Sequence, residues 1–142
     1  MRGLLADVNV QGHLTHLRYR LESLDLMSIL DEQRLRLATF GDLGLDMGLD
    51  DRRLWEFCQR QEWVVFTENR NDDGPDSLQR TLDDSWFIGC LPILTLSNKK
   101  RFEEDQVYQN RVAEDVAELM FGIASERQYC DQPRIYVPLR WP

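Results

Sequence analysis

Five short apolar segments alternate with segments of helical periodicity, and this alternation is the strongest constraint on the fold. In the segments between, apolar residues recur every three or four positions, as Leu14, Leu17 and Leu21 do. Strands that alternate with helices form a parallel sheet that is covered on both faces. The sequence therefore predicts a three-layer α/β/α fold with a mainly parallel sheet. The expected strands are Gly3–Val8, Arg34–Phe40, Trp63–Thr67, Leu91–Ser97 and Arg134–Leu139.

The composition of each apolar segment indicates its place in the sheet. Trp63–Thr67 is an unbroken run of aromatic and β-branched residues, which is typical of a strand buried on both faces. Arg34–Phe40 alternates leucine with arginine and predicts an edge strand with one polar face. We expect the Gly3–Val8 strand and the Trp63–Thr67 strand to be neighbours at the centre of the sheet.

Helix signals fill the intervals between the expected strands. One helix is predicted to begin near Gln11, and another begins at Asp50 or Asp51, either of which could cap it. Asp76 followed by Gln79 is a variant of the capping box and predicts a helix from about Ser77. Gly41–Leu49 contains three glycines and no period, so a loop is expected there. A long helix ending near Ser125 carries an apolar stripe of Val112, Val116, Leu119, Met120 and Ile123.

Length and charge limit the class of protein. The 142 residues are sufficient for one domain with a buried core, and no apolar run is long enough to span a membrane. Without a signal-peptide pattern, a cytoplasmic protein is expected. Of the net charge of −8, a share of −7 lies between Asp42 and Asp84, where twelve residues are acidic and five basic. This segment is expected to face water, hold cations or meet a basic partner; binding of nucleic acid by charge alone is disfavoured.

The cysteines and histidines do not form a recognisable metal motif. Cys58, Cys90 and Cys130 are odd in number and widely spaced, so we expect reduced and mostly buried thiols. His13 and His16 lie three residues apart with no third ligand nearby in the sequence. They are interpreted as polar residues beside the apolar stripe of a helix.

Polar side chains follow two of the expected strands at their carboxyl ends, where open α/β sheets place their sites. Asp7 and Asn9 lie at the end of the first strand, and the segment Glu68–Asp73 follows the central one. Asp51 opens the helix that leads into the central strand and could lie at the same rim. Carboxylates and amides that converge there would bind a hard cation such as Mg²⁺ or Mn²⁺. Such an ion can polarise a phosphodiester and activate water.

Each of these residues also has a structural interpretation. Asp7 could be a turn residue at the end of a strand, and Asp51 could be a helix N-cap. The segment Glu68–Asp73 could be a solvated loop, because Asn and Asp readily form turns. The sequence contains no glycine-rich phosphate loop and no serine nucleophile with a visible base, so it indicates neither of these other kinds of site.

Four short motifs, in order, resemble the PIN-like domain group, specifically its small DUF5615-type and Mut7-C-like proteins. They are Leu4–Asn9, Asp42–Leu45, Asp51–Trp55 and Val64–Asn71, and the resemblance covers roughly Leu4 to Ser97. It implies a single PIN-like domain over residues 1–142. It also implies a ribonuclease that depends on Mg²⁺ or Mn²⁺, often a toxin held by a cognate antitoxin.

The resemblance also assigns roles to residues at the rim. It implies that Asp7 and Asp51 are catalytic and hold the metal. In this chain Glu68 is expected to complete the catalytic set, and Asp72 the metal ligands. Binding of an RNA substrate falls to Asn9, Asn69, Arg70 and Asn71.

The chain departs from the usual Thr-x-Asp-x-Asp pattern, because Asn69 and Asn71 occupy the acidic places and supply no negative charge. Two hypotheses follow: a metal-dependent ribonuclease, or a non-catalytic PIN-like module that binds a protein or RNA partner through the same rim. Three or more carboxylates within reach of one ion favour the nuclease, whereas a rim with Arg70 and two amides at its centre favours the binding module. A homodimer is the better interpretation if the apolar stripe of the long helix is exposed.

Overall fold

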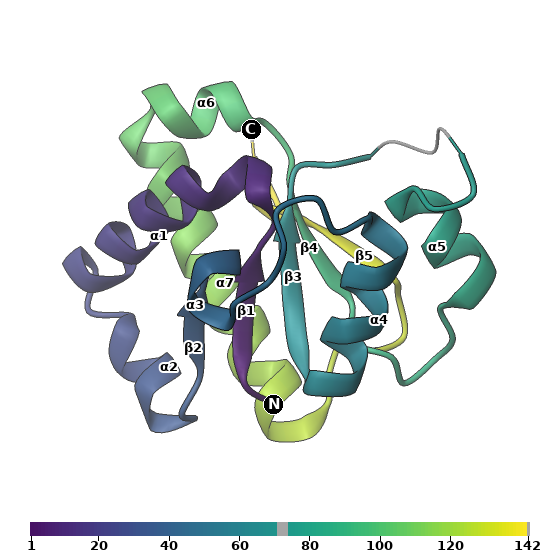
Figure 1. Ribbon diagram of the computed structural model, residues 1–142. Coiled ribbons are helices and arrows are strands. Elements are labelled where there is room, and N and C mark those ends of the chain that lie inside the picture. Colours follow the sequence, from purple (N-terminus) through teal and green to yellow (C-terminus); the bar gives the residue numbers. More distant parts are fainter. Residues whose placement is uncertain (71–73, 142) are drawn as a thin grey trace.

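All the strands in the described residues, 1–70 and 74–141, belong to one parallel sheet (Figure 1). In this computed structural model the strand order is β2-β1-β3-β4-β5, and every neighbouring pair is parallel. The predicted parallel sheet is therefore confirmed, as are the central β1–β3 pair and the edge position of β2. The strands are β1 (Gly3–Ala6), β2 (Arg36–Ala38), β3 (Trp63–Thr67), β4 (Ile93–Leu96) and β5 (Arg134–Val137).

Helices cover both faces of the sheet. On one face α1, α2, α6 and α7 enclose the larger apolar core, which includes Val64 and Phe66 of β3. On the other face α3, α4 and α5 pack against Trp63 and Val65 of the same strand. The α/β/α layering is thus confirmed. The helices are η1 (Val8–Val10), α1 (Gln11–Ser23), α2 (Met27–Glu32), α3 (Phe40–Leu43), α4 (Asp51–Gln61), α5 (Leu78–Ser85), α6 (Lys99–Glu104) and α7 (Gln106–Glu126).

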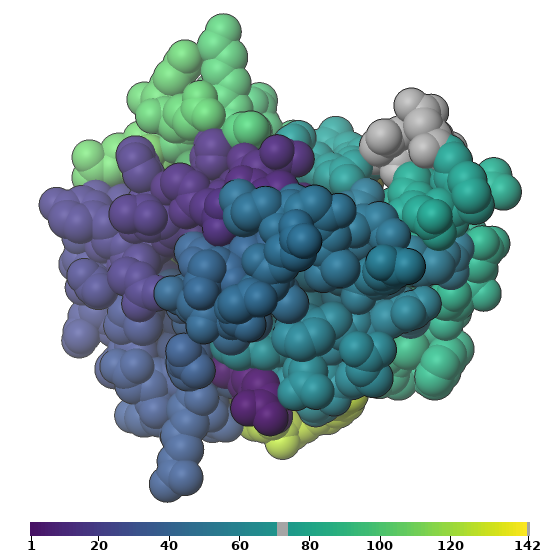
Figure 2. Space-filling model, viewed as in Figure 1, coloured from purple at the N-terminus to yellow at the C-terminus, as the bar shows by residue number. Residues whose placement is uncertain are grey.

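The two layers of helices, one on each face of the sheet, can be followed in the figures. In Figure 1, α7 passes behind the sheet and α4 lies in front of it. Figure 2 shows the same side filled with atoms: the blue and teal segment around α3 and α4 covers the strands. The carboxyl ends of the strands point upward in Figure 1, toward the edge where the chain leaves β3.

A glycine is required where β1 meets β2. Gly3 is paired with Arg36 and has a φ of 151°. A Cβ atom at this position would collide with the backbone carbonyl of Arg36. Glycine is the residue that tolerates both this conformation and such a close approach of two backbones.

The stretch Gly41–Leu49, expected to be a loop, begins instead with the last three residues of α3. Thr39 and Asp42 form a reciprocal capping box, with bonds of 2.9 Å from Thr39 N to the Asp42 carboxylate and 3.3 Å from Asp42 N to the Thr39 hydroxyl. The left-handed Gly44 then ends the helix. The loop prediction was therefore wrong for residues 41–43, where Gly41 lies inside a helix, and correct for residues 44–49, which belong to no helix or strand.

The structure identifies the N-cap residues of α4 and α5. The sequence left the first of these open between two aspartates and assigned the second to the wrong residue. Asp50 is the N-cap of α4, since its side chain accepts a 2.8 Å bond from Arg53 N, and Asp51 is the first helical residue. Ser77, and not Asp76, caps α5 by accepting from Arg80 N. The side chain of Asp51 is therefore available for other contacts.

The long C-terminal helix buries its stripe as predicted. Val112, Val116, Leu119 and Ile123 are at most 2% exposed and belong to the larger core. The three cysteines are free and buried, as expected. None of the helices in the described part of the chain is long and apolar enough to cross a membrane.

Candidate functional site

The candidate site lies where the sheet changes its direction of winding. From β1 the chain crosses to β2 on one side, whereas β3 pairs with β1 on the other. In a doubly wound sheet of this order, a crevice forms at the carboxyl ends of these two central strands. Asp7 follows β1 directly, and Thr67 is the last residue of β3.

Asp7 is buried and held by groups from both central strands. Its side chain is hydrogen-bonded through both oxygens: Oδ1 accepts from the backbone N–H of Asn9 at 3.0 Å, and Oδ2 accepts from the Thr67 hydroxyl at 2.6 Å. Its own backbone N–H donates to Phe66 at 2.9 Å. Asp7 therefore caps a turn, and its carboxylate is fixed at the point between β1 and β3 where the sheet changes its direction of winding (the switch point).

Asp51 approaches the same point from the first turn of α4. Its Oδ2 accepts a 3.0 Å bond from the side-chain amide of Asn69 and a 3.2 Å bond from Leu78 N. Burial raises the pKa of Asp51 from its ordinary value, and the charge of Asp7 raises it further. The two carboxylates thus lie close enough to repel each other.

Thr67 and Asn69 connect the two carboxylates. The Thr67 hydroxyl donates to Asp7 and accepts a 2.9 Å bond from the backbone N–H of Asn69, whose side chain in turn donates to Asp51. We refer to Asp7, Asp51, Thr67 and Asn69 as the carboxylate cluster. The structure therefore brings together three predicted site residues and adds Thr67, which the sequence placed only at the end of the strand.

Arg134 supports this cluster from β5 and was not predicted as a site residue. One terminal nitrogen of its guanidinium donates to the Asn69 carbonyl and to the Thr95 hydroxyl, both at 2.8 Å. The other donates to Gln79 at 3.0 Å. Burial lowers the pKa of this guanidinium. An arginine at the start of a largely apolar strand was the only signal in the sequence.

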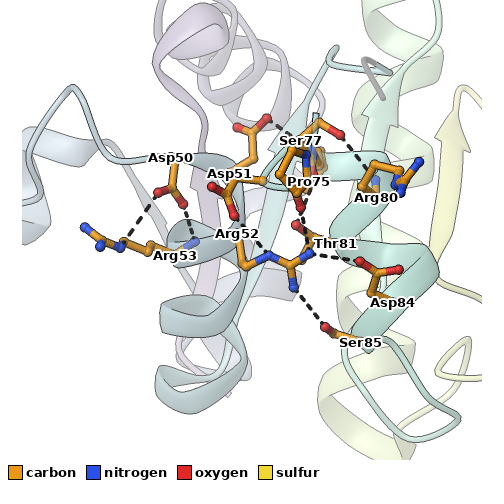
Figure 3. Close-up of polar contacts among 12 residues, drawn as sticks. Asp50, Asp51, Arg52, Arg53, Pro75, Ser77, Arg80, Thr81, Asp84 and Ser85 are labelled. Atoms are coloured by element: carbon orange, nitrogen blue, oxygen red, sulfur yellow. Dashed lines mark hydrogen bonds and ion pairs between the residues drawn. The ribbon is translucent and has the colours of Figure 1, made fainter. Parts of the chain in front are cut away.

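Arg52 joins α4 to α5 beside Asp51 (Figure 3). Its guanidinium contacts the Pro75 carbonyl at 2.7 Å, the Asp84 carboxylate at 3.1 Å and the Asp76 carboxylate at 3.3 Å. It also donates to the Ser85 hydroxyl at 3.2 Å. These contacts hold both the segment before α5 and the last two residues of α5 against the first turn of α4. Leu78 N, at the start of α5, reaches Asp51.

Arg70 lies at the rim but is directed toward the ends of β4 and β5. Its guanidinium donates to the Ser97 carbonyl and lies 5.2 Å from the centre of the Tyr136 ring. Arg70 is exposed, and Tyr136 is 43% exposed. Tyr136 was not predicted as a site residue, because the sequence indicated only a strand over Arg134–Leu139.

The remaining predicted residues have varied positions. Asn9 contributes its backbone N–H to Asp7, and its side chain is exposed. Glu68 is half-buried next to Thr67, and in the part of the chain that the structure describes its side chain makes no hydrogen bond. The predictions for Asn71 and Asp72 lie outside the described residues. His13, interpreted as a polar helix residue, pairs with Glu103 at 2.9 Å.

Two carboxylates limit what the site can hold. No group of three or more His, Cys, Asp or Glu residues that could hold a metal occurs within residues 1–70 and 74–141. Mg²⁺, however, is commonly bound through one or two carboxylates, with water and substrate phosphate completing its shell. Of the described residues, none donates to Oδ1 of Asp51. Asp7 and Asp51 are the two carboxylates that would hold a hydrated divalent cation here.

Comparison with known proteins gives no independent assignment. No family model, curated protein or solved structure matches this chain.

Proposed function

We propose that this protein is a PIN-like ribonuclease in which Asp7 and Asp51 hold one Mg²⁺ or Mn²⁺. The main support is the convergence of these two carboxylates, from different elements, at the switch point of a parallel sheet. Close carboxylates destabilise one another unless a cation or a proton neutralises them. A carboxylate whose pKa is raised by burial and by a neighbouring charge, as that of Asp51 is, is a candidate functional residue.

The residues of the cluster have distinct roles in this proposal. Thr67 and the Asn9 backbone fix the orientation of Asp7, and Asn69 fixes that of Asp51. A bound divalent cation would supply Lewis-acid polarisation of a phosphodiester and an activated water. Glu68, half-buried beside Thr67, is the candidate to accept or donate a proton.

Arg70 and Tyr136 supply the contacts that a single-stranded RNA requires. An exposed arginine can bind a backbone phosphate, and an exposed aromatic ring can stack on a base. Both lie at the same end of the sheet as the carboxylate cluster, since Asn69 and Arg70 are consecutive. A bound RNA strand would therefore run from Tyr136 toward Asp7.

The test combines thermal denaturation with an RNA cleavage assay. Millimolar Mn²⁺ should raise the melting temperature of the wild type, because an ion that binds only the folded state stabilises it. Asp7→Asn should reduce this shift and abolish cleavage of a single-stranded RNA. Asp131→Asn is the matched control, because it removes the same charge from an exposed residue before β5, at the opposite end of the sheet. An unchanged melting temperature, with equal cleavage by wild type and Asp7→Asn, would overturn the proposal.

A second candidate function is a non-catalytic module that binds RNA or a protein through the same rim. The observation in its favour is Asn69, whose neutral amide occupies one oxygen of Asp51. RNA binding that persists in EDTA without any cleavage would support it.

If the nuclease is a toxin, a cognate antitoxin should suppress cleavage when the two are mixed.

A further inference from the structure

A groove lies between α2 and α7, on the face of the sheet opposite α4. Its volume is about 430 Å³. The apolar side chains that line it are Leu26, Ile29, Ala117 and Phe121. Phe121 is 44% exposed, although it lies on a helix whose neighbouring residues form the core. The groove therefore presents apolar surface to solvent at a distance from the carboxylate cluster.

The rim of this α2–α7 groove is acidic. Glu32, Glu114 and Glu118 line it together with the apolar residues. Lysine and arginine are absent from the described residues that line it. Among the residues that the structure describes, no ion pair involves any of these three glutamates. Arg111 and Arg140 line a neighbouring pocket together with Glu114, but no described basic residue lines the groove itself, so its rim is negative.

The acidic residue that follows Glu114 in the sequence has a different role. Asp115 is buried, accepts a 2.7 Å bond from Leu139 N and lies 3.9 Å from Arg111. It anchors the chain after β5 to α7. The three glutamates of the rim have no comparable contact, which separates them from acidic residues that stabilise the fold.

We propose that the α2–α7 groove binds a basic amphipathic helix of another protein. A helix that lays an apolar face into a groove places its anchors at positions i, i+3 or i+4, and i+7. Leu26, Ile29 and Phe121 would receive such anchors. Lysine or arginine side chains beside the anchors would face Glu32, Glu114 and Glu118, and this charge complementarity selects a basic partner.

A second copy of this chain fits the groove less well. A two-fold dimer brings the same surface of both subunits together, so the glutamates of one groove would face those of the other. Like charges at an interface oppose association. The occupant is therefore a separate protein and not another copy.

The test uses two labelled peptides with identical apolar residues, one with lysine and arginine at its polar positions and one with glutamate. Fluorescence anisotropy should detect salt-sensitive binding of the basic peptide and none of the acidic one. The variant Glu114→Gln/Glu118→Gln should weaken binding about tenfold. Phe121→Ser should weaken it further because the anchor loses its apolar contact. Glu56→Gln, an exposed residue on α4, is the matched control and should bind as the wild type does.

Circular dichroism and thermal unfolding of each variant verify that the fold is kept, since every substituted side chain is exposed. Equal binding of the two peptides would overturn the proposal, as would an equal loss of affinity in Glu56→Gln. Self-association that is seen by sedimentation and lost in Phe121→Ser would make a second copy the occupant, which also overturns it.

Discussion

The Thr67 hydroxyl donates a 2.6 Å hydrogen bond to the buried carboxylate of Asp7, across the two central strands. Thr67→Val keeps the shape of the side chain but leaves Asp7 Oδ2 without this donor. An unpaired buried acceptor costs about 1–3 kcal/mol of unfolding free energy. Urea denaturation should show this loss in Thr67→Val and a much smaller loss in Thr67→Ser, which keeps the hydroxyl. Equal losses in both variants would mean that the hydroxyl has no part in holding Asp7.

Asn69→Asp tests whether the missing charge limits metal binding. The change removes the amide donor to Asp51 and places a third carboxylate near Asp7. Without metal, the variant should unfold at a lower temperature than the wild type because of like-charge repulsion. With millimolar Mn²⁺, its melting temperature should rise by more than that of the wild type.

Asn69→Ala is the matched control for this prediction. It also removes the amide donor to Asp51, but it adds no charge. Its response to Mn²⁺ should therefore be no larger than that of the wild type. If Asn69→Asp responds to Mn²⁺ as Asn69→Ala does, the position is not close enough to Asp7 and Asp51 to share an ion with them.

The parts of the fold that were predictable depend on local patterns. Trp63–Thr67 was predicted with the bounds that the structure has, because buried parallel strands are continuous apolar runs. The short helices α2 and α6, each of six residues, were missed. Helices of this length have too few turns for an apolar period to be recognised. Their stability comes from packing against α1 and α7, which the sequence does not display.

The candidate site was predictable only where a strand end identifies it. Asp7 follows an apolar strand, so the general rule for open sheets selected it. The role of Asp51 depended on which of two adjacent aspartates caps α4, and only the structure assigns the cap to Asp50. Arg134 was invisible because its contact with Asn69 joins residues that are 65 positions apart.

Arg134 is expected to stabilise the site and the sheet together. Arg134→Met preserves most of the side-chain length but removes the bonds to Asn69, Thr95 and Gln79. Because hydrogen bonds from charged groups are each worth about 1.5–3 kcal/mol, urea denaturation should show a loss of at least about 2 kcal/mol. Arg140→Met, which changes an exposed arginine beyond β5, should have little effect. A loss of the same size in both variants would indicate a general charge effect instead.

Leu119 tests the packing of α7 on the sheet. It is fully buried in the larger core, so Leu119→Ala should lower the free energy of unfolding by about 2–5 kcal/mol. Val107→Ala on the same helix is the control, because Val107 is 67% exposed and its truncation should change stability by less than about 0.5 kcal/mol. Urea denaturation of both variants measures the difference. A small effect at Leu119 would contradict the burial of the stripe.

The raised pKa of Asp51 predicts how stability depends on pH. Burial, and to a lesser extent the charge of Asp7, make the folded state bind this proton more tightly than the unfolded chain does. Between the ordinary value of 3.8 and the raised value, stability therefore falls as the pH rises. Asp51→Asn lacks this titration, so the wild type should lose stability relative to the variant across that window. Mn²⁺ competes with the proton, and its stabilisation of the wild type should grow as the pH passes above the raised pKa. Urea midpoints measured from about pH 3 to about pH 7, with and without Mn²⁺, check both effects. A difference between wild type and variant that does not change with pH would show that the pKa of Asp51 is not raised in the folded protein.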